Sequence, residues 1–152
     1  MPRRSASAAA SPSVTRLRMS SRRTAVAPMV ERVLRLARRA QLSPERRENL
    51  AVALAEALSN AAVHGHRERP RALVLVRVET APGGHVVVDV RDSGAGFDVA
   101  SVVDPTDPQR LLMPGGRGVF LMRRLVDRLE YNAQGNHVRL IMDGHQHRRS
   151  SD

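Results

Sequence analysis

Glu56 and Asn60 are a carboxylate and a carboxamide spaced four residues apart. The surrounding residues have helical periodicity, so the two side chains lie one turn apart on the same side of a helix. They border an apolar stripe of leucines and alanines, where polar groups are costly to desolvate unless something binds them. One interpretation is a general base and a metal-coordinating oxygen on the wall of a ligand pocket. Taken alone, however, the pair fits the border of an ordinary amphipathic helix better.

Asp92 and the glycines that follow it could hold a flat ligand. The valines of the predicted strand 86–91 share one face, and period two places Asp92 on that face, toward the helices. Gly94 and Gly96, in the segment Asp-Ser-Gly-Ala-Gly, let the backbone approach a ligand closely. Many such turns are purely structural, so this segment by itself is weak support for a site.

A second glycine-rich segment, residues 115–118, opens a predicted helix over residues 119–128. The free N–H groups and the positive end of the dipole at such a helix start suit a phosphate. The chain contains no lysine, which excludes P-loop and Schiff-base chemistry because both need a lysine amine.

The elements that must position these residues follow from periodicity and turn residues. Ser43 and Pro44 predict the start of a central helix that runs to about Val63 and ends at Gly65. The proline-containing stretch 97–114 lacks clear periodicity, which is typical of a functional lid or a disordered loop. The other predicted elements are an edge strand at 14–19, a helix beginning at Pro28, a hairpin of strands 73–78 and 86–91, and a closing hairpin of strands 129–132 and 137–142.

The composition indicates one domain with an aliphatic core. A length of 152 residues is enough for a single core, and the absence of cysteine fits a reducing, cytoplasmic compartment. No apolar run approaches the ~20 residues of a membrane span. We expect a disordered basic tail at 1–13, the folded domain at 14–143 and a loose polar tail at 144–152.

The net charge of +10 is concentrated in residues 1–40, which hold ten arginines and one glutamate. Such a segment can bind phosphates, but it lacks interleaved aromatic residues and any recognisable nucleic-acid-binding motif. Direct nucleic-acid binding is therefore disfavoured. A solvated arm or a surface for an acidic protein partner fits better. No apolar segment follows Arg3 and Arg4, so a twin-arginine signal is rejected, as is a transit peptide. His64 and His66 have no third ligand nearby, which disfavours a zinc site.

Three motifs occur in order: Glu56-Ala-Leu-Ser-Asn60 on a helix, Asp92-Ser-Gly-Ala-Gly96 after a strand, and Gly115-Gly-Arg-Gly118 before a helix. Together they resemble the N box and the two glycine boxes of the GHKL superfamily, and the likeness spans roughly residues 14–143. The sequence around these motifs is most similar to the bacterial anti-sigma-factor serine kinases. The resemblance implies a Bergerat-type ATP-binding fold, a two-layer α+β sandwich. Its sheet would be mixed and mostly antiparallel, with helices on one face and ATP between the helices under the lid.

The resemblance also assigns roles to single residues. Asn60 resembles the residue whose amide oxygen binds Mg²⁺, with ATP phosphates and waters completing the octahedron. Glu56 resembles the general base for a seryl hydroxyl, and Asp92 the acid that accepts a hydrogen bond from the adenine amino group. Gly94 and Gly96 correspond to the glycines that shape the pocket and hinge the lid. The phosphate-facing turn corresponds to Gly115, Gly116 and Gly118, with Arg117 as a candidate phosphate contact.

A chain of this length has no room for the dimerisation domain of a histidine kinase or the transducer domain of gyrase B or MutL. The resemblance therefore implies an ATP- and Mg²⁺-dependent protein serine kinase that meets its partners in trans. It would act as an anti-sigma factor that sequesters a sigma factor and phosphorylates an anti-anti-sigma protein of the STAS type. A homodimer is expected because many members of the family are homodimers. The alternative is a non-catalytic ATP-binding anti-sigma or regulatory module.

Overall fold

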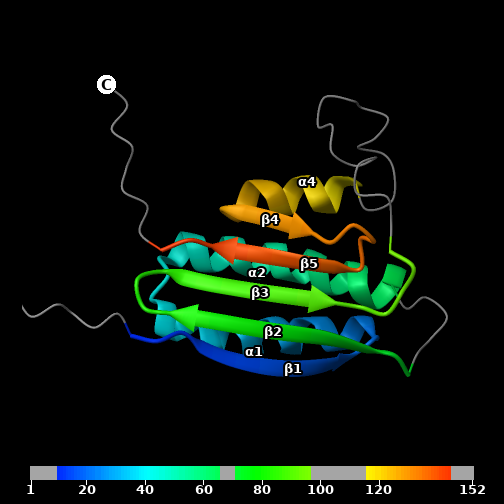
Figure 1. Cartoon of the computed structure of the whole chain (residues 1–152), viewed down its shortest axis with the longest axis horizontal. Helices are drawn as coiled ribbons and strands as arrows, with labels where there is room; N and C mark the ends of the chain where they lie inside the picture. The colour runs from blue at the N-terminus through cyan, green and yellow to red at the C-terminus, as the bar shows by residue number, and fades with distance from the viewer. Residues whose placement is uncertain (1–9, 66–70, 97–115, 145–152) are drawn as a thin grey trace, which may run out of the picture.

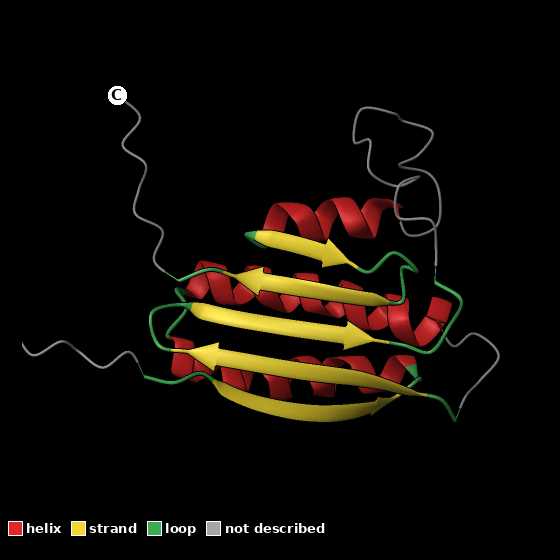
Figure 2. Ribbon diagram, viewed as in Figure 1, coloured by secondary structure: helices red, strands yellow, loops and turns green. Residues whose placement is uncertain are grey.

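The structure, a computed structural model, describes residues 10–65, 71–96 and 116–144. These residues form two layers, a five-stranded sheet and a set of helices that lie on one of its faces (Figures 1 and 2). The expected two-layer α+β sandwich is therefore confirmed. The elements in chain order are β1 Ser13–Ser20, η1 Arg23–Ala25, α1 Val26–Ala37, η2 Arg38–Ala40, α2 Pro44–Ser59, η3 Asn60–Gly65, β2 Leu73–Ala81, β3 His85–Arg91, α4 Gly116–Leu125, β4 Arg128–Tyr131 and β5 His137–Met142.

The sheet has the strand order β1-β2-β3-β5-β4, with β1 at one edge as predicted. Where a mixed sheet is expected from the resemblance, all four pairings of the described strands are antiparallel. Alternating valines of β2 and β3 point toward the helices and form the sheet side of the core, because successive side chains of a strand face opposite ways. These valines are at most 1% exposed: Val74, Val76, Val78, Val86, Val88 and Val90.

The helix α2 begins as the sequence predicts. Ser43 caps it by accepting a hydrogen bond from the backbone N–H of Arg46 at 3.2 Å, and Pro44 occupies the first helical position. The predicted apolar stripe is the centre of the core, where Leu50, Leu54 and Leu58 are fully buried. No helix among the described residues is long and apolar enough to cross a membrane.

Two other helices have bounds that differ from the prediction. The helix α1 begins at Val26, before Pro28, because a proline within the first turn loses no helical hydrogen bond. The helix α4 begins at Gly116 and ends at Leu125, so Arg128 belongs to β4 and not to the predicted helix 119–128. The second glycine-rich segment therefore supplies the first turn of α4 itself.

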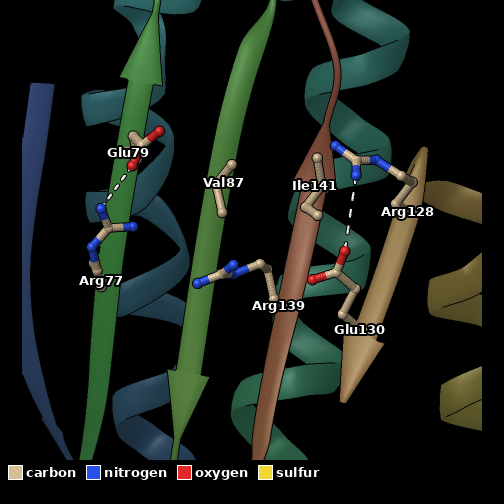
Figure 3. Close-up of a pocket in the computed structure, with 7 residues that line it drawn as sticks. All are labelled: Arg77, Glu79, Val87, Arg128, Glu130, Arg139 and Ile141. Atoms are coloured by element: carbon tan, nitrogen blue, oxygen red, sulfur yellow. Dashed lines mark hydrogen bonds and ion pairs between the residues drawn. The ribbon is translucent and has the colours of Figure 1, made fainter. Parts of the chain in front are cut away.

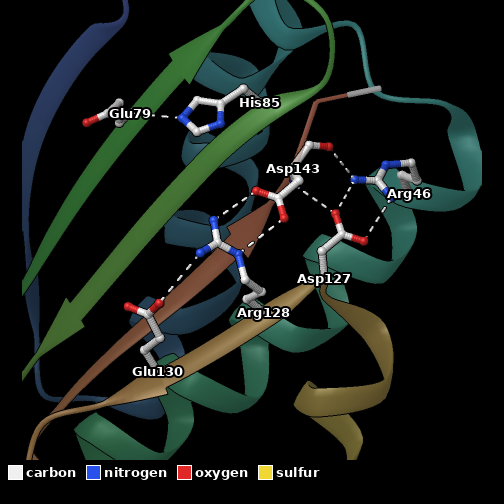
Figure 4. A network of polar contacts seen from close by, with 7 residues as sticks. All are labelled: Arg46, Glu79, His85, Asp127, Arg128, Glu130 and Asp143. Carbon is white, nitrogen blue, oxygen red and sulfur yellow. Dashed lines mark hydrogen bonds and ion pairs between the residues drawn. The ribbon is translucent and has the colours of Figure 1, made fainter. Parts of the chain in front are cut away.

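A clamp of charged residues fixes the start of α2 to the α4–β4 junction and to the end of β5 (Figure 4). The guanidinium of Arg46 donates to both carboxylate oxygens of Asp127, at 2.6 and 3.3 Å, and to the carbonyl of Asp143 at 3.0 Å. Asp127 also accepts from the backbone N–H of Asp143 at 2.7 Å, and Arg128 pairs with the Asp143 carboxylate at 3.0 Å. Since Asp127 lies between α4 and β4, this clamp helps to set the position of α2 relative to α4.

Asp89 is a buried carboxylate on the face of the sheet away from the helices, with 8% of its side chain exposed. Its Oδ1 accepts from Arg139 Nε at 2.8 Å and from His137 Nε2 at 2.9 Å, and its Oδ2 lies 3.4 Å from Arg77 Nη1. Burial acts to raise the pKa of Asp89, but the hydrogen bonds from Arg139 and His137 outweigh it, so the pKa lies below its ordinary value.

We expect Asp89→Asn to lower the free energy of unfolding near pH 7 by about 1.5–3 kcal/mol, the usual contribution of hydrogen bonds to a charged group. A lowered pKa stabilises the fold above the unfolded-state pKa of ~3.9, and this contribution is lost as the pH falls through the folded-state value. The difference between the two proteins should therefore shrink in acid, which urea unfolding at pH 7 and pH 3 would measure.

Glu48→Gln is the control for this prediction, because it removes a carboxylate at an exposed position of α2, away from the partners of Asp89. It should change stability little at either pH. A difference between wild type and Asp89→Asn that is as large at pH 3 as at pH 7 would show that the carboxylate charge is not responsible.

Candidate functional site

Glu56 and Asn60 lie together against the first turn of α4. Both side chains are half-buried, at the C-terminal end of α2 and the start of η3. A β-carbon placed on Gly118 would be 2.9 Å from Glu56 Oε2 and 3.5 Å from Asn60 Nδ2. The backbone of α4 thus approaches the two side chains so closely that only a glycine leaves them undisturbed. Because α4 begins here, the positive end of its dipole lies beside the Glu56 carboxylate.

Asn60 also begins a π-helical turn, η3, where the periodicity predicts a continuous α-helix to about Val63. The backbone N–H of Asn60 donates to the carbonyls of both Glu56 and Ala57. A π-helical segment adds a residue to the turn, and such segments occur frequently at functional sites. The predicted end of the helix at Gly65 agrees with the end of η3.

The loop of Asp92, Gly94 and Gly96 is held by the turn between β4 and β5. Asp92 N–H donates to the carbonyl of Asn136 at 3.0 Å, and Asn136 Nδ2 donates to the carbonyl of Gly94 at 3.2 Å. Within the loop, Gly94 N–H donates to Asp92 Oδ1 at 2.7 Å, which forms an Asx turn. Gly96 has a φ of 77°, and a β-carbon there would lie 1.8 Å from the carbonyl oxygen of Gln134. Both its backbone angle and this contact require a glycine.

These two clusters lie at the same end of the molecule. Figure 1 shows the C-terminal ends of α2 and β3, the first turn of α4 and the β4–β5 turn together at one end of the sandwich. Gly116 and Arg117 lie in the first turn of α4, where the Arg117 side chain is exposed. Gly115, His66 and the predicted lid at 97–114 fall outside the described residues. The structure therefore describes these residues of the predicted site: Glu56, Asn60, Asp92, Gly94, Gly96, Gly116, Arg117 and Gly118.

A separate depression of about 280 Å³ lies on the opposite face of the sheet (Figure 3). Its lining comes from β2, β3, β4 and β5, and the sheet separates it from α2 and the candidate site. The ion pair between Arg77 and Glu79 at 2.7 Å lies along β2, on one side of the depression. The lining residues are Arg77, Glu79, Val87, Arg128, Glu130, Arg139 and Ile141.

Asn136 bonds to the Asp92 loop and Asn132 bonds to Asn136, whereas the sequence predicts only a turn between the two closing strands. Asparagine is common in turns, so its presence there carries no sign of a contact with a distant loop. The one available signal is the pair of asparagines four residues apart flanking a glycine between two strands. That pattern indicates a side-chain-stabilised turn, but it does not indicate which loop the turn touches.

A family of histidine kinase-like ATPase domains matches residues 19–142, which include α1, α2, α4 and most of the sheet. The chain belongs to this family. The histidine kinase-like ATPase match contains Glu56, Asn60, Asp92 and the glycines of both predicted boxes. The family assignment agrees with the observed fold, an antiparallel sheet with helices on one face.

Two relatives match parts of this chain. The chain is 31% identical over 85 residues to an anti-sigma F factor of Heyndrickxia coagulans. The aligned region covers 53% of this chain and 56% of the relative. It is 29% identical over 105 residues to the serine-protein kinase RsbW of Oceanobacillus iheyensis, with 65% and 66% covered. The chain thus matches less than two thirds of the length of these two relatives.

A solved structure supports the fold alone. The histidine kinase domain of a blue-light activated histidine kinase from Erythrobacter litoralis superposes with a TM-score of 0.50 at 19% identity. The superposition covers 79% of this chain and 59% of that one. The shared architecture is therefore retained at a sequence identity too low to carry over a reaction.

Proposed function

We propose that this protein is an ATP- and Mg²⁺-dependent protein serine kinase that acts as an anti-sigma factor. It phosphorylates an anti-anti-sigma protein of the STAS type and sequesters a sigma factor. The observation that carries the proposal is the contact of Glu56 and Asn60 with Gly118, because it joins a base and an amide to a helix start suited to phosphate. Family membership and the names of the relatives support it.

Asn60 would hold Mg²⁺ through its amide oxygen. Among the described residues, no group of three or more His, Cys, Asp or Glu side chains could hold a metal ion by itself. A single amide oxygen therefore fits a hard cation that keeps several waters and takes its remaining ligands from substrate phosphates. When bound, Mg²⁺ would neutralise charge on the β- and γ-phosphates.

Glu56 is the proposed general base. The seryl oxygen of the protein substrate attacks the γ-phosphorus of ATP, the bond from that phosphorus to the ADP oxygen breaks, and the seryl proton passes to the Glu56 carboxylate. Glu56 is half-buried beside the first turn of α4, and most of the acceleration would come from positioning and charge stabilisation. Gly116, Gly118 and the preceding Gly115 would face the phosphates, with Arg117 as a further contact.

Asp92 would recognise adenine by accepting a hydrogen bond from its amino group. Its loop is held in place by the β4–β5 turn through the backbone hydrogen bonds of Gly94, and Gly96 allows the close approach of backbone that this packing needs. The adenine would thus lie at the end of β3 and the phosphates at the start of α4.

The second candidate is an anti-sigma protein of the same family that binds ATP without transferring phosphate. The relative from Heyndrickxia coagulans supports this alternative because its name gives only the anti-sigma role. The two candidates share the nucleotide site and differ in whether Glu56 works as a base.

Phosphotransfer to a defined partner separates the two. The full chain is incubated with radiolabelled ATP and purified anti-anti-sigma protein, with and without Mg²⁺, while ATP affinity is measured by calorimetry. We expect Mg²⁺-dependent ATP binding and labelling of a serine or threonine of the partner. ATP binding without labelling would favour the non-catalytic module, and no ATP binding would contradict both.

Gly118→Ala should slow phosphotransfer at saturating ATP by on the order of 10- to 100-fold, because a misplacement of about 1 Å at a reacting group can cost that much. The added β-carbon would meet Glu56 Oε2 at 2.9 Å, so the flexible carboxylate has to move away. Leu121→Ala, at an exposed position of the same helix, is the matched control. Equal rates for the two variants would remove Gly118 from the site.

A further inference from the structure

We infer that Asn132 and Asn136 are positioning residues for base recognition, a role that rests on the proposed function of the Asp92 loop. Both lie in the β4–β5 turn, which is at the same end of the molecule as the C-terminal end of α2 (Figure 1). Neither is placed at the reacting atoms. They act through the loop that carries Asp92.

Asn132 organises the turn. Its Oδ1 accepts three backbone N–H groups, from Gly135 at 2.8 Å, Asn136 at 3.1 Å and His137 at 3.2 Å. Its Nδ2 donates to Asn136 Oδ1 at 2.7 Å. The acceptor side of the Asn136 carboxamide is therefore occupied within the turn, and this fixes which way the carboxamide faces.

Asn136 connects the turn to the Asp92 loop. With its oxygen turned to Asn132, its NH₂ group donates to the carbonyl of Gly94 at 3.2 Å, across 42 residues of sequence. Its backbone carbonyl accepts from Asp92 N–H at 3.0 Å, and Gly94 N–H returns to Asp92 Oδ1 at 2.7 Å. The result is a closed ring of hydrogen bonds that includes the Asp92 carboxylate itself.

The close packing of Gly96 on Gln134 supports the same reading, because the loop and the turn meet backbone to backbone where no side chain fits. Side chains that bind a ligand are held in the binding geometry by hydrogen bonds to neighbouring residues. Loss of such a neighbour lowers the affinity for the ligand or the selectivity between ligands. Loss of the Asn136 donor should therefore let the Asp92 carboxylate move while the fold persists.

Asn136→Asp is the direct test. The new carboxylate still accepts from Asn132 Nδ2, but it has no hydrogen to give to the Gly94 carbonyl. We expect ATP binding to weaken by about 3- to 10-fold, the usual effect of one hydrogen bond, and the preference for ATP over GTP to narrow. Ala133→Asp adds the same charge in the same turn at an exposed side chain and should leave both quantities unchanged.

A double-mutant cycle with Asp92→Asn separates positioning from a general structural role. If Asn136 acts through Asp92, Asn136→Asp should cost little further ATP affinity in the Asp92→Asn background. Additive losses, or an unchanged affinity and ATP-to-GTP ratio in the single variant, would overturn the inference. A wild type that does not bind ATP would contradict the proposed function instead, so the two failures are distinguishable. Asn132→Ala, which frees the Asn136 carboxamide, should reproduce the narrowed preference.

Discussion

Replacing Glu56 with glutamine is expected to leave ATP affinity within about twofold of wild type and to slow phosphorylation of the protein substrate at least ~100-fold. A general base typically contributes ~10²–10⁴-fold to the rate, and glutamine cannot take the seryl proton. Glutamine keeps the size of the side chain, so its packing against Gly118 and the nearby Asn60 amide is retained. Single-turnover phosphotransfer with saturating ATP measures the chemical step.

Glu48→Gln removes a carboxylate from an exposed position of α2 and is the control for Glu56→Gln. It should leave the rate unchanged. If Glu56→Gln transfers phosphate at the wild-type rate, Glu56 is not the base. If the variant loses ATP affinity as well, the main role of Glu56 is in binding the nucleotide.

The second large effect is expected for Asp92→Asn, which should raise the ATP dissociation constant at least tenfold. A hydrogen bond to a charged group contributes about 1.5–3 kcal/mol, and every 1.4 kcal/mol is a factor of ten. Asparagine can still accept the 2.7 Å hydrogen bond from Gly94 N–H, so the Asx turn remains and the loss reports on the ligand. Calorimetric titration with ATP measures the change.

A ligand without the amino group provides the control for Asp92→Asn. Purine riboside triphosphate lacks the group that Asp92 is proposed to recognise, so wild type and variant should bind it with similar affinity. An ATP dissociation constant that does not change in the variant would remove Asp92 from adenine recognition. Equal weakening for both nucleotides would indicate a change in the loop and not a lost contact with the amino group.

Local pattern predicts most elements of this fold, because periodicity and capping act within a few residues. The Ser43 cap, the buried leucines of α2 and the strand His137–Met142 all agree with the prediction. The start of α1 and both ends of α4 differ from the prediction. The helix α1 begins earlier because proline is accommodated in a first turn, and α4 begins earlier because packing against α2 allows glycines inside a helix. The π-helical turn at Asn60 leaves no mark in the periodicity.

The sequence by itself determined which residues could do chemistry and which segment type carries each of them, since residue identity, spacing and turn chemistry are local. Only the tertiary structure decided that Gly118 lies against Glu56 and Asn60, and that the Asp92 loop is tied to Asn136. Those contacts join segments far apart in the chain. They depend on how α2 packs on α4 and on which strand pairs with β3, and no short stretch of sequence contains that information.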